Sequence, residues 1–92
     1  MSSPVPASAP QDLYATSAAL RRLAGEQRAV VRWWAAECRA CNARCRARFS
    51  TANVAAATEA RRTLRVYAEA WSATRAQLRA CEAALAGLAV PS

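Results

Sequence analysis

The six residues FSTANV, Phe49 to Val54, interrupt a chain that otherwise has the composition of a helix. Ser50, Thr51 and Asn53 are residue types that favour the N-terminal cap of a helix. Their clustering predicts that one helix ends here and a second begins. Neither glycine nor proline occurs within these six residues, so one unbroken helix is the alternative interpretation.

Two stripes of residues, spaced alternately by about four and three, flank this segment. The first stripe runs over 13–49 and the second over 57–88, and such spacing keeps each stripe on one helical face. We therefore predict helices over about 10–48 and 53–87. An antiparallel hairpin buries the stripes against each other, whereas a single long helix leaves its stripe exposed. The expected fold is all-α: a coiled-coil-like antiparallel two-helix hairpin, which oligomerisation or a partner is expected to complete into a bundle.

The stripes supply the predicted packing core. Folding the chain about residues 51 and 52 places Trp34 opposite the region of Tyr67 and Trp71, which suits an aromatic centre. Alanine accounts for twenty-six residues and offers little surface to bury, so the larger stripe residues carry most of the packing. We expect the core to comprise Leu20, Val31, Trp34, Cys38, Cys41, Cys45, Leu64, Tyr67, Trp71, Leu78, Cys81 and Leu85.

The same pairing predicts a polar layer and the level of the most distant cysteine. Gln27 is expected to meet Thr74 and Leu78, and a buried polar layer of this kind can fix the register of a coiled coil. Cys81 is expected near Leu20 and Ala24. At ~1.5 Å per residue, this level lies roughly 20–30 Å along the helix from the other three cysteines.

The stretch ECRACNARCRARF, Glu37 to Phe49, holds those three cysteines as C-x2-C-x3-C. Cys38, Cys41 and Cys45 fall on the core stripe, and small reduced cysteines are common buried residues. Structural zinc requires four ligands, but the chain has no histidine and Cys81 is too distant. We expect packing roles, with a metal or redox role and an intermolecular disulfide as alternatives.

The N-terminal segment MSSPVPASAPQ is rich in Ser, Pro and Ala. We expect residues 1–10 to form a disordered arm and residues 11–90 to form the hairpin. The segment lacks the basic and apolar regions of a secretory signal, and no apolar run approaches the ~18 residues of a membrane span. These features favour a soluble intracellular protein with reduced thiols.

All thirteen basic residues are arginine, against six acidic residues, which gives a formal charge of +7. Many of these arginines lie near the proposed turn, where an arginine-rich tip would suit nucleic acid or an acidic protein. The alternative is a solvated surface that reflects a GC-rich coding sequence. The candidate contact residues are Arg39, Arg44, Arg46, Arg48, Arg61, Arg62 and Arg65.

A second apolar stripe, formed by Leu23, Val30 and Trp33, runs beside the first. Trp33 and Trp34 project about 100° apart on a helix and cannot both enter a two-helix seam. We expect this stripe to bind further helices; the alternative is that Trp33 packs over neighbouring side chains at the surface.

The titratable residues give little support to catalysis. The chain has no histidine, a single aspartate, Asp12, and five glutamates spread over different faces, so no nucleophile and base can be paired. We expect no enzyme activity and no cofactor. The predicted function is that of a helical interaction or scaffold subunit, which packs against itself or another protein; a nucleic-acid-binding module that uses the arginine-rich tip is the alternative.

Overall fold

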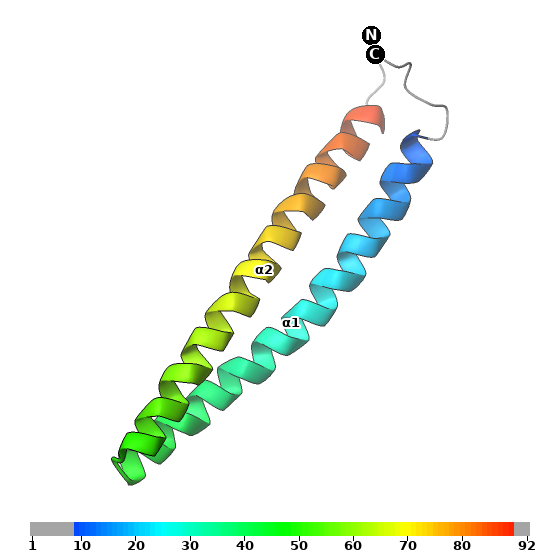
Figure 1. Cartoon of the computed structure of the whole chain (residues 1–92). Coiled ribbons are helices and arrows are strands. Elements are labelled where there is room, and N and C mark those ends of the chain that lie inside the picture. The colour runs from blue at the N-terminus through cyan, green and yellow to red at the C-terminus, as the bar shows by residue number, and fades with distance from the viewer. Residues whose placement is uncertain (1–8, 90–92) are drawn as a thin grey trace.

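The computed structural model describes residues 9–89 and the side-chain environments of residues 11–88. Two antiparallel helices, α1 (Ala9–Ala47) and α2 (Thr51–Ala89), form an elongated hairpin with extents of 64 × 26 × 18 Å (Figure 1). The predicted all-α hairpin is confirmed, and each helix boundary lies within two residues of its prediction.

The first helix begins earlier than expected. Ala9 and Pro10 belong to α1, so the helix begins one residue before its predicted start at about 10 and includes the last two residues assigned to the arm. The first turn of a helix accepts proline, because the amide groups there have no partner within the helix. The rest of the predicted arm, 1–8, lies outside the described residues.

Three residues, 48–50, make the turn between the helices. The Ser50 Oγ accepts a hydrogen bond from the backbone N–H of Asn53 at 3.1 Å, which is the geometry of an N-cap. The Asn53 Nδ2 donates to the carbonyl oxygen of Arg48 at 2.7 Å, at the end of α1. The described residues include no positive φ angle, so side chains rather than glycine reverse the chain.

Small residues form the buried part of the seam, the line along which the stripes of α1 and α2 meet. The cluster nearest the turn consists of Cys38, Cys41, Ala57 and Ala60, and half-buried side chains pack around it. Small side chains let the two helices approach closely, but they bury little apolar surface. At the other end of the hairpin, Cys81 is also buried.

The predicted core residues differ in burial. Cys38, Cys41 and Cys81 are buried, whereas Tyr67 is 40% exposed and is not a core residue. Four buried residues on the stripes were not in the predicted core: Ser17, Ala57, Ala60 and Thr74. The remaining predicted members are half-buried: Leu20, Val31, Trp34, Cys45, Leu64, Trp71, Leu78 and Leu85.

The predicted polar layer does not form a hydrogen bond across the seam. Thr74 donates its hydroxyl to the carbonyl oxygen of Ala70, within α2, at 3.1 Å. The Gln27 Oε1 is buried and has no hydrogen-bond partner among the described residues. The Cys81 Sγ donates to the carbonyl oxygen of Leu13 at 3.2 Å, so the thiol contacts α1 on the N-terminal side of Leu20, its predicted neighbour.

Candidate interaction surfaces

Two polar contacts between the helices define one side of the hairpin. Near the open end, Arg21 Nη2 lies 3.3 Å from the Glu82 carboxylate. Near the turn, Arg61 Nη1 donates to Asn42 Oδ1 at 3.2 Å. Three of these four residues directly follow a buried seam residue, and Arg21 follows the half-buried Leu20. The residues that follow seam residues on α1 and α2 therefore share one side of the hairpin.

This side, which we call the basic side, holds most of the arginines. All of them are exposed and each directly follows a residue of the seam. On α1, five arginines fall within a narrow arc, since their spacings are four or seven residues. The basic side comprises Arg21, Arg28, Arg32, Arg39, Asn42 and Arg46 on α1, with Thr58, Arg61, Arg65, Ser72, Arg75, Arg79 and Glu82 on α2.

The charge of the chain is divided unequally between this side and the remainder. The basic side carries nine arginines and one acid, Glu82, a net charge of +8. The remainder of the chain carries four arginines and five acids, a net charge of −1. The formal charge of +7 thus resides on one side of the hairpin.

The predicted tip arginines do not form a separate group. Arg39, Arg46, Arg61 and Arg65 belong to the basic side, which continues to the open end of the hairpin. The other three are placed elsewhere: Arg44 and Arg62 form ion pairs with glutamates at 3.2 Å, and Arg48 lies in the turn. The basic side thus includes four of the seven predicted contact residues and extends beyond the tip.

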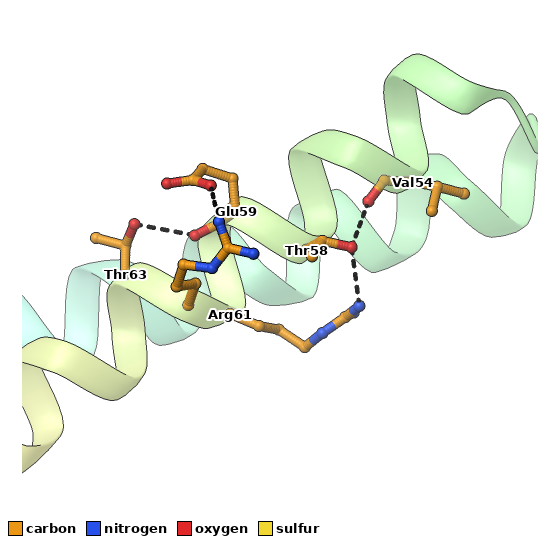
Figure 2. Close-up of polar contacts among 6 residues, drawn as sticks. Val54, Thr58, Glu59, Arg61 and Thr63 are labelled. Carbon is orange, nitrogen blue, oxygen red and sulfur yellow. Dashed lines mark hydrogen bonds and ion pairs between the residues drawn. The ribbon is translucent and has the colours of Figure 1, made fainter.

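The edge of the basic side near the turn contains a hollow of about 210 Å³, lined by Thr58, Arg61, Arg62 and Arg65. Figure 2 shows the polar contacts of Thr58 and Arg61, two of the residues that line the hollow. Thr58 donates its hydroxyl to the Val54 carbonyl oxygen at 2.9 Å and accepts a hydrogen bond from Arg61 at 3.5 Å. The Arg61 and Arg62 guanidinium groups at the hollow are therefore held in part by polar contacts within α2.

Arg44 lies on the side of the hairpin opposite to the basic side, where it forms an ion pair with Glu37. Its Nη2 lies 3.2 Å from Glu37 Oε1 and 3.0 Å from Cys41 Sγ. The hydrogen bond to Glu37 raises the pKa of the Arg44 guanidinium, and the contact with Cys41 raises it further. Cys41 also donates its thiol to Glu37 at 3.8 Å, so a polar group lies over the edge of the cysteine cluster.

The opposite side, which we call the apolar side, consists of residues that directly precede seam residues. Since the residues before and after a seam residue lie 200° apart on a helix, they occupy opposite sides of the hairpin. Exposed apolar side chains gather here: Leu23 at 42%, Val30 at 36%, Trp33 at 59% and, on α2, Val66 at 60% exposure. The predicted partner-binding residues therefore share one solvent-facing row.

Aromatic contacts join this row to the seam. Trp33 meets Trp34 edge-on, with ring centroids 4.9 Å apart. Trp34 in turn stacks on Tyr67 of the other helix, with centroids 6.5 Å apart and planes at 15°. Trp33 thus packs against Trp34, in line with the alternative interpretation, while more than half of its side chain faces solvent.

The four cysteines are free, and they lie in two places. Cys38, Cys41 and Cys45 pack near the turn, whereas Cys81 contacts the backbone near the start of α1. Leu13 and Cys38 are separated by 25 residues of one helix, about 37 Å. Within the described residues, no three His, Cys, Asp or Glu side chains are arranged to hold a metal ion.

The helices of residues 9–89 include none whose length and hydrophobicity would suffice to cross a bilayer. Comparisons of the chain with protein families, with curated proteins and with solved structures give no match. The fold and its surfaces define a helical hairpin with one basic and one apolar side.

Proposed function

We propose that this protein is a non-catalytic interaction subunit whose apolar side packs against helices of a second copy or of another protein. The observation that carries the proposal is the row of Leu23, Val30 and Trp33, which remains exposed beside a seam that buries little. The buried apolar residues of the described chain are three cysteines and two alanines. Further helices over this row would add the large apolar contacts that the seam lacks.

The residues of α2 that lie on the apolar side suit close contact with another helix. It contains Ala70, Ala73, Ala80 and Ala84, all exposed, together with Val66. Small residues allow another helix backbone to approach, while Trp33 and Leu23 supply bulk that can insert beside them. Aromatic anchors of this kind dominate the energetics of many interfaces.

Sedimentation of the full chain across a concentration series tests self-association. We expect a species larger than the monomer, and Trp33→Ala should weaken it at least tenfold while the helical circular dichroism stays near that of the parent. Phe49→Ala is the matched control, since this side chain is 86% exposed and lies in the turn.

A protein partner is tested by affinity capture with the parent chain, Trp33→Ala and Phe49→Ala as baits. A partner that the parent and the Phe49 variant retain, and the Trp33 variant loses, would support packing on the apolar side. A chain that stays a stable, cooperatively folded monomer and loses no partner on Trp33 substitution would refute the proposal.

A further inference from the structure

We propose that the basic side binds the phosphate backbone of double-stranded nucleic acid along the length of the hairpin, without reading base sequence. The surface differs from the predicted arginine-rich tip in extent and in the residues that it includes. From Arg21 to Arg46 it spans 25 residues of α1, about 37 Å. A duplex of that length carries on the order of 20 phosphates.

The arrangement of charge on this surface is the first observation in support. Arg32, Arg39 and Arg46 follow one another at intervals of seven residues, about 10 Å along a straight helix. Within the described residues, none of the three forms an ion pair. The guanidinium groups are thus free to exchange counterions for phosphate contacts.

The polar residues among the arginines are the second observation. Asn42 and Ser72 occupy the same side, and side chains of these types, like arginine, commonly contact phosphate oxygens. The hollow lined by Thr58, Arg61, Arg62 and Arg65 has room for one phosphate group at the edge of this surface.

The scarcity of exposed apolar side chains favours a duplex over other polyanions. Tyr14, which follows Leu13 at the open end, is the only exposed large apolar residue found directly after a seam residue in the described part of the chain. An acidic protein partner would require buried anchors, and a single strand would require aromatic side chains on which bases stack. Trp71 does not serve that purpose, because the Arg75 guanidinium covers its ring at 4.0 Å.

Fluorescence anisotropy with a labelled 20-base-pair DNA duplex of mixed sequence tests the proposal. For the full chain we expect binding whose logarithmic affinity falls linearly with the logarithm of salt concentration. The double variant Arg28→Gln, Arg39→Gln should bind about tenfold more weakly at ~100 mM salt, with a salt slope smaller by about 2.

The matched control is Arg22→Gln, Arg44→Gln, which removes the same charge from outside the basic side, since Arg22 does not follow a seam residue and Arg44 precedes the seam residue Cys45. We expect its affinity to change less than threefold. Equal losses in the two variants, or no binding at ~50 mM salt, would overturn the proposal. Tighter binding to a 20-nucleotide single strand or to poly-glutamate than to the duplex would also overturn it.

The test is independent of the proposed helical assembly. Trp33→Ala leaves the basic side intact, so its duplex affinity per chain should remain within about threefold of the parent at protein concentrations where both are in the same association state. If Trp33→Ala abolishes assembly but not duplex binding, the two surfaces act separately. Loss of duplex binding in a folded Trp33 variant would contradict the assignment of binding to the basic side.

Discussion

Arg28 of α1 and Arg75 of α2 occupy corresponding positions on the basic side of the hairpin, and both carry positive charge. Each lies seven residues, two helical turns, inward from a member of the Arg21–Glu82 ion pair. A shift of seven residues along either helix leaves a residue on the same side of the hairpin. Arg28 and Arg75 therefore occupy positions equivalent to those of the Arg21–Glu82 ion pair, but both of their charges are positive.

Replacement of Arg28 by glutamate should stabilise the hairpin while it weakens duplex binding. The new carboxylate would face Arg75 as Glu82 faces Arg21, and exposed pairs of this kind contribute about 0.2–1 kcal/mol. Urea unfolding at low and high salt measures the gain, which should shrink as salt rises. Arg22→Glu, on the outer face, is the control; an equal gain there would show that net charge alone is responsible.

Replacement of Ser50 by alanine should destabilise the hairpin by about 1 kcal/mol, because it removes the N-cap of α2. Thermal unfolding followed by circular dichroism measures the loss. Thr51→Ala is the matched control, since the Thr51 side chain makes no hydrogen bond among the described residues and its replacement should cost less. Equal costs at the two positions would contradict the capping role of Ser50.

Replacement of Cys41 by alanine should cost about 1–2 kcal/mol in unfolding free energy, because this residue is only 3% exposed and its volume is lost. Serine should cost more, since a hydroxyl is harder to bury than a thiol. Urea unfolding with and without chelator provides the measurement. A chelator that destabilises the parent, or stoichiometric zinc in protein purified without added metal, would contradict the packing role.

Replacement of Gln27 by leucine should raise the unfolding free energy by about 1 kcal/mol. The change removes a buried carbonyl oxygen that has no hydrogen-bond partner among the described residues, and such a group costs about 1–3 kcal/mol. The exposed Gln77 supplies the control, because leucine there gains little from burial. A destabilised Gln27→Leu protein would show that the amide makes an interaction that offsets its burial.

The turn and the helices could be predicted from local chemistry. Ser50 and Asn53 are capping residue types, and both make the hydrogen bonds that close the turn. The four- and three-residue spacing likewise identified the seam, because burial follows the helical repeat.

The depth of burial could not be predicted from the same pattern. Ala57 and Ala60 are buried because the helices approach closely near the turn, whereas Tyr67, on the same stripe, is too large to enter the seam fully. Spacing gives the direction of a side chain but not the distance between helices. Nearness to the turn could not predict the basic side, because what its arginines share is their position directly after seam residues along the whole hairpin.

The three-residue turn also determines the order in which we expect contacts between the two helices to form. The Arg61–Asn42 contact joins residues 19 apart in the chain, while the Cys81–Leu13 contact joins residues 68 apart. Direct closure of the longer loop costs about 1 kcal/mol more chain entropy than closure of the shorter one. We therefore expect the turns beside the cysteine cluster to pair first, and the ends of the helices far from the turn to pair last and to separate first.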